Sequence, residues 1–193
     1  LRETMFRDRA TQFRDRLGWV VTVDEQGFER DQYDALNPLY VIWEGPGGRH
    51  GGSMRFLPTT GRCMVNEHFI HLNGGVPIND PQIWECTRFC LAPGTGSHVA
   101  ASLMLAGGQL LERRGLRHFA GVFDANMERI YRRLGACPEI LGHAGEGRDR
   151  MSLGLWSLTI AARAQVARRA DLSATLMDFW YGRALCTETQ QAI

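Results

Sequence analysis

Near the middle of the chain stands the hexapeptide Trp84-Glu85-Cys86-Thr87-Arg88-Phe89. It reads as a β-strand that carries an acid, a guanidinium and a hydroxyl among large apolar residues. A buried carboxylate and a buried guanidinium are costly unless each finds a partner. We therefore interpret a strand that carries both Glu85 and Arg88 as part of a functional site. The alternative interpretation is a core strand held by a salt bridge.

Regular strand geometry would separate these two side chains. On a flat strand, Glu85 lies on one face with Thr87, whereas Arg88 lies on the other. Both can serve one pocket only if the strand bulges or splays, a distortion that is common beside active sites. The hexapeptide therefore predicts a distorted strand at the centre of the fold.

The composition indicates one domain without a dominant charge. The length of 193 residues suits a single domain with a sizeable core. Because 22 basic residues nearly balance 21 acids, we expect neither nucleic acid nor a membrane as a partner. All 22 are arginine. Arginine favours bidentate contacts with carboxylate or phosphate, although a GC-rich genome would also explain this choice.

The cysteines and histidines form no metal-binding or disulfide pattern. The five cysteines are Cys63, Cys86, Cys90, Cys137 and Cys186. Their spacing matches no common zinc site, so reduced thiols in a cytoplasmic protein are the simplest interpretation. The six histidines form neither an HExxH motif nor a Ser/His/Asp order, which argues against metal or triad chemistry. No apolar run has membrane-spanning length, and no signal peptide is recognisable.

Hydrophobic periodicity and turn residues predict an alternation of helices and strands. Helices are expected at residues 2–17, 63–72, 98–114, 127–134, 159–169 and 173–185. Strands are expected at residues 39–44, 52–57, 84–89, 117–123, 138–141 and 151–158. Residues 24–37 form a polar loop that could close over a ligand. The strand–helix–strand order after residue 84 implies one parallel pair within a largely antiparallel sheet.

Four fragments carry a family resemblance. They are Arg9-x3-Phe13-x5-Trp19, Glu29-Arg30-Asp31-Gln32-Tyr33-Asp34, Gly52-Ser53-Met54-Arg55-Phe56-Leu57-Pro58-Thr59-Thr60 and the hexapeptide at 84–89. In this order and spacing, the chain resembles the acyl-homoserine-lactone synthases, the autoinducer synthases of bacterial quorum sensing. The motifs cover roughly the first half of the chain, and the second half matches only in the order of its elements. Family members carry a short strand before the first helix, so we expect that an N-terminal piece is missing here.

The resemblance implies both a fold and a reaction. The fold would be α+β and GNAT-like, with a mixed, mostly antiparallel sheet flanked by helices in three α/β layers, in a single domain over residues 1–193. An acyl thioester, on acyl carrier protein or coenzyme A, would acylate the amine of S-adenosylmethionine. The methionyl carboxylate would then close an N-acyl-L-homoserine lactone and expel methylthioadenosine. Both partners are substrates, so no cofactor is expected.

The resemblance assigns the catalytic role to the hexapeptide. Glu85 is the candidate general base for the substrate amine, directly or through a water molecule, with Arg88 beside it. Desolvation by Trp84 and Phe89 would raise the pKa of Glu85 toward neutrality, whereas direct pairing with Arg88 would lower it. Backbone N–H groups of the splayed strand would meet the thioester oxyanion.

The expected S-adenosylmethionine site lies earlier in the chain. A sulfonium is a cation without hydrogen-bond donors, so it suits an aromatic face. The resemblance places Phe13 and Trp19 there, with core packing as the alternative. Asp31 and Asp34 would hold the ammonium or the ribose, unless they are only solvated loop acids. The candidates for fixing carboxylates, of the substrate or of these acids, are Arg9, Arg55 and Arg88, with structural salt bridging as the alternative.

The strand at 117–123 is expected to wall an acyl pocket that Gly121 and Phe123 line. In a gapless alignment, relatives that prefer 3-oxo chains carry threonine at the position of Gly121. Glycine has no hydroxyl for a 3-oxo group and leaves extra volume, which favours an unsubstituted, branched or aryl acyl group. Alternatively, Gly121 only allows two backbones to approach.

Other features leave alternatives open. Gly94 and Gly96 predict a helix N-terminus that receives pantetheine or pyrophosphate, or only a helix cap. The basic runs 112–117 and 132–133 would meet an acidic carrier or coenzyme A phosphates, or are solvated helix ends. Two rival functions remain: an N-acyltransferase that uses acetyl coenzyme A, and a non-catalytic binding module on the same fold.

Overall fold

The structure, a computed structural model, describes residues 1–157, 159–173, 175–176 and 178–183. Its helices are α1 (Arg2–Ala10), α2 (Met64–His68), α3 (Ser97–Arg114), α4 (Ala125–Leu134) and α5 (Ile160–Ala170). Its strands are β1 (Leu39–Glu44), β2 (His50–Pro58), β3 (Ile83–Leu91), β4 (His118–Asp124), β5 (Glu139–Ala144) and β6 (Met151–Trp156). The order of elements predicted from the sequence is confirmed.

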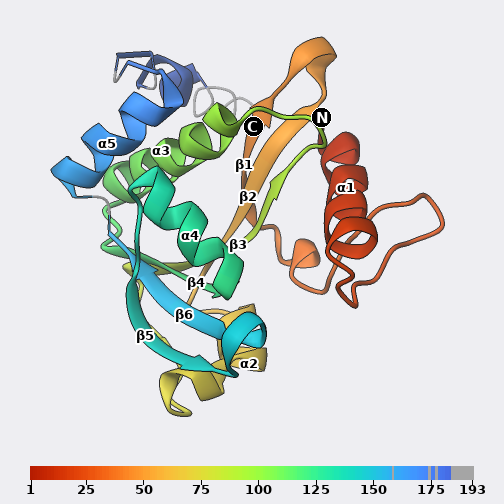
Figure 1. Cartoon of the computed structure of the whole chain (residues 1–193), viewed down its shortest axis with the longest axis vertical. Helices are drawn as coiled ribbons and strands as arrows, with labels where there is room; N and C mark the ends of the chain where they lie inside the picture. Colours follow the sequence, from red (N-terminus) through yellow and green to blue (C-terminus); the bar gives the residue numbers. More distant parts are fainter. Residues whose placement is uncertain (158, 174, 177, 184–193) are drawn as a thin grey trace, which may run out of the picture.

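The strands form one six-stranded sheet in the order β1-β2-β3-β4-β6-β5. Every neighbouring pair is antiparallel except β3 and β4, which are parallel. In Figure 1 the sheet lies between α3, α4 and α5 on one side and α1 and α2 on the other. The α+β class, the single parallel pair and the flanking helix layers are therefore as predicted.

Alternation along the strands supplies a core on each face of the sheet. On one face, Phe56 and Phe119 pack with ring centroids 4.5 Å apart, in a cluster with Leu103 of α3. On the other face, Ala120, the residue after Phe119, lies in a cluster with Val65 of α2. Both helix layers are thus held to the sheet by buried apolar side chains.

The central strand β3 is distorted next to β2. Ser53 of β2 pairs with Cys90, and Arg55 pairs with Thr87, so β3 carries one extra residue between these pairs. Within this bulge Arg88 has a φ of 53°, in the left-handed region that non-glycine residues rarely adopt. The bulge predicted from the hexapeptide is confirmed.

β3 also separates from its parallel neighbour. The register with β4 runs only from the pair Ile83 and His118 to the pair Glu85 and Ala120. Beyond Glu85, the edge of β3 that faces β4 has no ladder partner in the described chain. The two strands therefore form a V that opens from Glu85 toward their carboxyl ends.

Some boundaries differ from those expected. The first helix does not stay α-helical to residue 17 but changes to a π-helical segment at Thr11–Arg16. The helix expected at 63–72 is divided into α2 and a 3₁₀ turn at Ile70–Asn73. The second C-terminal helix, 173–185, lies partly outside the described residues, and residues 175–176 and 178–183 are helical.

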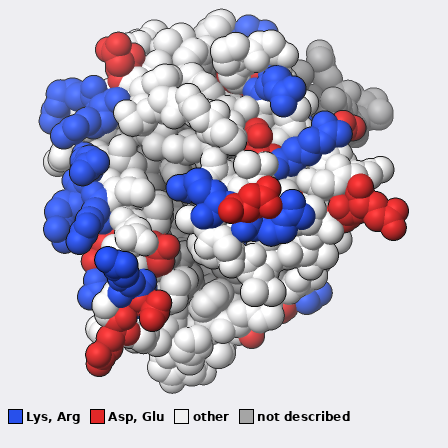
Figure 2. Space-filling model, turned by 45° about the vertical axis from the view of Figure 1, so that its right-hand side comes forward, with Lys and Arg blue, Asp and Glu red and all other residues white. Residues whose placement is uncertain are grey.

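The described surface carries charges of both signs. Figure 2 shows arginines and acids beside one another, with uncharged side chains between them. The four cysteines that the structure describes are free thiols, and Cys186 lies outside the described residues. Within the described ranges, no helix combines the length and apolar character needed to cross a membrane.

Candidate functional site

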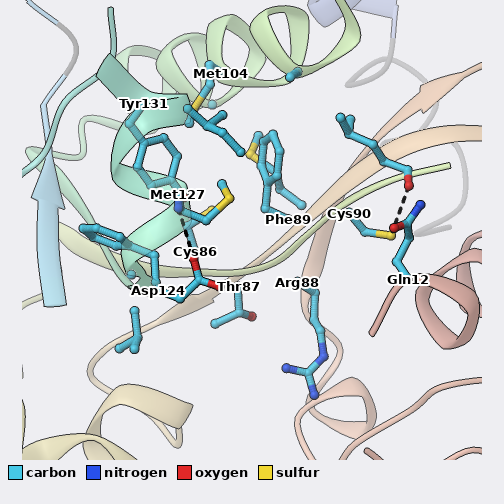
Figure 3. Close-up of a pocket in the computed structure, with 18 of the residues that line it drawn as sticks. Gln12, Cys86, Thr87, Arg88, Phe89, Cys90, Met104, Asp124, Met127 and Tyr131 are labelled. Carbon is cyan, nitrogen blue, oxygen red and sulfur yellow. Dashed lines mark hydrogen bonds between the residues drawn. The ribbon is translucent and has the colours of Figure 1, made fainter. Parts of the chain in front are cut away.

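A cavity of about 1170 Å³ opens where β3 and β4 separate. Its walls come from the π-helical segment, β3, β4, α3, α4 and β6. In Figure 3, β3 runs across this space, with Met127 and Tyr131 of α4 on one side and Gln12 at the far end. The distortion predicted in the hexapeptide therefore forms part of a cavity wall.

Two buried arginines hold the polar loop beside the cavity. Arg9 is fully buried and donates to Glu29 at 2.5 Å and to the two oxygens of Asp34 at 3.0 and 2.9 Å. Arg55, also fully buried, binds both oxygens of Asp31 at 2.5 and 2.9 Å and one oxygen of Asp34 at 2.9 Å. The loop acids are thus paired, and the alternative of solvated acids does not apply.

Arg88 joins this network from the bulge. Its guanidinium lies 3.1 Å from an oxygen of Glu29 and 2.7 Å from an oxygen of Asp31. It also lies 5.6 Å from the ring centre of Phe13. Unlike Arg9 and Arg55, Arg88 lines the cavity. Of these three arginines, Arg88 can therefore contact a ligand, whereas the buried Arg9 and Arg55 hold the loop acids in place.

The network also fixes the charge of Asp34. Burial alone would raise the pKa of this carboxyl, but the hydrogen bonds and charge of Arg9, together with the charge of Arg55, hold it well below its usual range. The hydroxyl of Tyr40 donates to the same carboxylate. Asp34 is therefore ionised throughout the neutral range.

Glu85 is buried, with only 1% of its surface exposed. Its two oxygens accept hydrogen bonds from the backbone N–H groups of Met64, at 3.1 Å, and Val65, at the start of α2. Burial raises the pKa of Glu85, and the opposing effects of these bonds and of the Arg55 charge are smaller. Arg88 pairs with the loop acids instead of Glu85. From the sequence, desolvation could raise the pKa of Glu85 and pairing with Arg88 could lower it. In the structure the pKa is raised.

Phe13 and Trp19 form a stacked pair at the cavity. Their ring centroids are 5.1 Å apart and their planes differ by 6°. Both residues line the cavity. Phe13 is 2% exposed, whereas Trp19 is 43% exposed. Phe13 is thus a core residue as well as a lining residue, and Trp19 keeps accessible surface for a ligand.

β4 forms part of the cavity wall. Gly121 and Phe123 both line the cavity. A Cβ atom at Gly121 would lie 3.0 Å from Cζ3 of Trp156 and 3.1 Å from the carbonyl oxygen of Cys86. The Trp156 indole therefore takes up part of the volume that glycine leaves free. Trp156 packs edge-on against Phe123, at 5.4 Å, and Tyr131, at 5.0 Å.

The predicted site residues divide into two groups. Those that line the cavity are Phe13, Trp19, Arg88, Gly121 and Phe123. Those that do not line it are the buried residues Arg9, Arg55 and Glu85 and the loop acids Asp31 and Asp34. Gly94 also lines the cavity and has a φ of 75°. In the basic run 112–117, Arg113 pairs with Asp178 and Arg117 with Asp80 at exposed positions, as expected for solvated helix ends.

Sequence reasoning missed Glu29 as a member of the site. Its buried carboxylate bridges Arg9 and Arg88. Glu29 begins one of the quoted fragments, but an acid in a polar loop is usually solvated, so its position gave no reason to select it. The wall residues Tyr131 and Trp156 were missed because their spacing indicated only core packing.

Comparisons with known proteins agree on one family. The family model "Autoinducer synthase" matches residues 1–153. An acyl-homoserine-lactone synthase of Rhizobium etli is 41% identical over 164 residues, which cover 81% of this chain and 77% of the relative.

Solved structures give the same result. The CoA-dependent acyl-homoserine lactone synthase MesI superposes with a TM-score of 0.77 and 28% identity, over 89% of this chain and 88% of MesI. TofI, solved in a ternary complex with an inhibitor and MTA, superposes with a TM-score of 0.71 and 27% identity, over 90% of this chain and 91% of TofI. A putative N-acetyltransferase from Lactobacillus plantarum shares the fold alone, with a TM-score of 0.55 and 16% identity over 81% of this chain and 91% of that protein. The GNAT-like fold expected from the sequence is therefore confirmed.

Proposed function

This chain belongs to the autoinducer synthase family, and we propose that it makes an N-acyl-L-homoserine lactone from S-adenosylmethionine and an acyl thioester. Residues 1–193 act as one synthase domain, in the cytoplasm. Both small molecules are substrates, and neither is a resident cofactor. The acyl donor is acyl coenzyme A or acyl carrier protein.

One observation carries this proposal. The bulge in β3 presents Arg88, which is paired with the loop acids, to the same cavity that the separating strands β3 and β4 enclose. The lining from the π-helical segment, the residues that follow it and β3 offers an aromatic face and a guanidinium, from Phe13, Trp19 and Arg88. The lining from β4 includes Gly121 and Phe123. A sulfonium amino acid and an acyl chain are chemically suited to these two sets of residues.

The acyl-transfer step needs a base. The amine of S-adenosylmethionine must lose a proton as its nitrogen bonds to the thioester carbon. Glu85 lies behind the cavity wall, so it acts through a bridging water molecule. Its raised pKa makes it a stronger base than an ordinary glutamate. The proton moves to Glu85 through that water as the C–S bond breaks.

The oxyanion that forms on the thioester oxygen needs hydrogen-bond donors. Beyond Glu85, the edge of β3 facing β4 has no ladder partner in the described chain. Peptide N–H groups at this edge are therefore free to meet the oxyanion. The second step, attack of the methionyl carboxylate on its own γ-carbon, is intramolecular, and holding the substrate curled against Arg88 accelerates it.

Incubation with S-adenosylmethionine and a panel of acyl thioesters tests the proposal. A synthase releases both methylthioadenosine and free thiol, together with the lactone. An N-acyltransferase releases thiol alone, and a non-catalytic binder releases neither. The TofI structure holds MTA, which favours the first outcome.

We expect Trp19→Ala to weaken S-adenosylmethionine binding by roughly 2- to 30-fold, the range of a cation–π contact. Binding of the acyl thioester should change less, because an acyl chain has no cationic centre to interact with the indole of Trp19. Titration of each ligand by calorimetry measures both effects. Trp19→Phe, which keeps an aromatic face, should retain most of the affinity. Equal losses for the two ligands would make Trp19 a general packing residue.

We expect Gly121→Thr to shift the preference of the enzyme toward 3-oxo thioesters. The new hydroxyl can donate to the 3-oxo oxygen, and one neutral hydrogen bond corresponds to about a 2- to 10-fold change. The added Cβ also presses on Trp156, so activity on both substrates should fall. The measured quantity is the ratio of kcat/KM for matched 3-oxo and unsubstituted thioesters.

Gly121→Val is the matched control, because valine has the shape of threonine without its hydroxyl. It should crowd Trp156 and leave the ratio unchanged. If threonine and valine change the ratio equally, Gly121 acts only through volume, and the assignment of a hydrogen bond at this position is wrong.

A further inference from the structure

Methionine side chains are concentrated around the cavity. The structure describes six methionines, and all of them except Met5 line it: Met54, Met64, Met104, Met127 and Met151. Met5 and Met54 are 0% and 2% exposed, whereas the other four are partly exposed. The thioether sulfur is the atom of methionine that oxidants attack. A small oxidant that enters the cavity therefore meets several oxidisable side chains.

Met64 contacts both proposed functional residues of β3. It is the first residue of α2, and its backbone N–H donates to a carboxylate oxygen of Glu85 at 3.1 Å. Its sulfur accepts a hydrogen bond from Nη1 of Arg88, with 3.9 Å between the two atoms. A chemical change at Met64 would therefore act next to both Glu85 and Arg88.

The three nitrogens of the Arg88 guanidinium are not equally occupied. Nε and Nη2 donate to Glu29 at 3.2 and 3.1 Å, and Nη2 also lies 2.7 Å from an oxygen of Asp31. Among the described residues, Nη1 has only the Met64 sulfur as a hydrogen-bond partner. A thioether is a weak acceptor. Because Arg88 lines the cavity, Nη1 is the nitrogen that remains available for the carboxylate of a ligand.

An oxygen atom on the Met64 sulfur would take this nitrogen away from the ligand. Oxidation converts the apolar thioether into a polar sulfoxide. Because Nη1 donates to the sulfur, a sulfur lone pair faces this nitrogen, and an oxygen added there would lie directly against it. Hydrogen bonds from a charged donor are roughly twice as strong as those between neutral groups. The sulfoxide would therefore occupy the donor that the substrate carboxylate needs.

We propose that Met64 is a modification site, at which hydrogen peroxide inactivates the enzyme by converting this residue to methionine sulfoxide. This inference rests on the proposed function. In the step, a lone pair of the thioether sulfur attacks one peroxide oxygen, the S–O bond forms and the O–O bond breaks. Sulfur loses two electrons, and the attacked oxygen gives its proton to the departing hydroxide, so that one water is released. The sulfoxide oxygen then accepts from Nη1 of Arg88 and excludes the carboxylate of S-adenosylmethionine.

The test treats the wild type with hydrogen peroxide and then with dithiothreitol, which reverses sulfenic acids and disulfides of the cysteines but not a sulfoxide. Peptide mass spectrometry should find one added oxygen on Met64. The Kd for S-adenosylmethionine, measured by calorimetry, should rise roughly 10- to 100-fold, the range of a hydrogen bond to a charged group. The Kd for the acyl thioester should change less, because the acyl group offers no carboxylate to Arg88.

Met64→Leu has a side chain of similar volume without sulfur, so peroxide should leave the Kd of this variant at its own untreated value. Met127→Leu is the matched control. Met127 also lines the cavity, but in Figure 3 the Arg88 guanidinium points away from it, so this variant should stay as sensitive as the wild type.

A rise in Kd for Met64→Leu equal to that of the wild type would overturn the inference. Oxidation of Met64 with an unchanged Kd would also overturn it, and so would treatment that oxidises Met127 but leaves Met64 unmodified. Failure of the untreated wild type to make lactone would instead overturn the proposed function, which keeps the two results distinct.

Discussion

Replacing Glu85 with glutamine should lower lactone formation at least about tenfold, within the ~10²–10⁴-fold range of a positioned general base. Glutamine has the size of glutamate and keeps one oxygen, which can accept from one of the two backbone N–H groups, of Met64 and Val65, that the two carboxylate oxygens bind now. It cannot take up the amine proton. The expected change is therefore in turnover, with the Kd for S-adenosylmethionine little affected.

The pH profile distinguishes a base from a structural residue. Burial raises the pKa of Glu85 above its usual value, and a base acts only when it is deprotonated. The wild-type rate should therefore fall as the pH drops through this raised pKa, at a higher pH than for an ordinary glutamate. Glu85→Gln should lose this limb of the profile. Unchanged turnover in the variant would remove Glu85 from the mechanism.

Glu67→Gln is the control for the position of α2. Glu67 lies on α2 and accepts hydrogen bonds from Tyr33 and Arg62. Its replacement perturbs how α2 is anchored without touching the proposed base. We expect turnover to stay within about threefold of wild type. A loss as large as that of Glu85→Gln would mean that both variants act by displacing α2.

Replacing Arg9 with methionine should lower the free energy of unfolding by about 3–5 kcal/mol, the usual cost of removing one partner from a buried ion pair. Arg9 is fully buried and supplies ion pairs to Glu29 and Asp34. Methionine fills similar space but leaves both carboxylates short of a partner. Because most domains have only about 5–15 kcal/mol of stability, this variant should be marginal. Chemical denaturation at neutral pH measures the loss.

Two controls test the ion-pair explanation. Arg14→Met removes an arginine whose pair with Asp15 is half exposed, and it should change stability little. In the double variant Arg9→Met, Glu29→Gln, one stranded charge is neutralised, so the two changes should be less than additive. Additive losses would mean that Arg9 contributes through packing and not through its charge.

The stability loss should also depend on pH. Although burial alone would raise the pKa of Asp34, Arg9 and Arg55 hold it well below its unfolded value near 4. The stabilisation from this pairing is present above the unfolded pKa and is lost as the pH falls through the folded pKa. The difference in stability between wild type and Arg9→Met should therefore shrink below about pH 4. A constant difference would exclude Asp34 as the relevant partner.

The sequence by itself determined the order of elements and the family. Hydrophobic periodicity marked the strands and most of the helices because core-facing positions repeat every two or every three to four residues. The residues at 84–89 also predicted a bulge in the strand, because Glu85 and Arg88 cannot face one site from a regular strand. These conclusions depend on local geometry, which neighbouring residues specify.

The tertiary structure alone decided how the charges pair and where the ligands have room. Glu29, Arg9 and Arg88 are far apart in the chain, and no spacing rule reveals that they meet in one buried cluster. The pKa of Glu85 is raised because burial outweighs the opposing backbone N–H groups of Met64 and Val65, and neither burial nor these contacts can be deduced from the residue types alone. Similarly, the sequence indicated free volume at Gly121, but the Trp156 ring from β6 occupies part of it. Burial, long-range pairing and backbone donors arise only when distant segments pack together, so only the folded chain determines them.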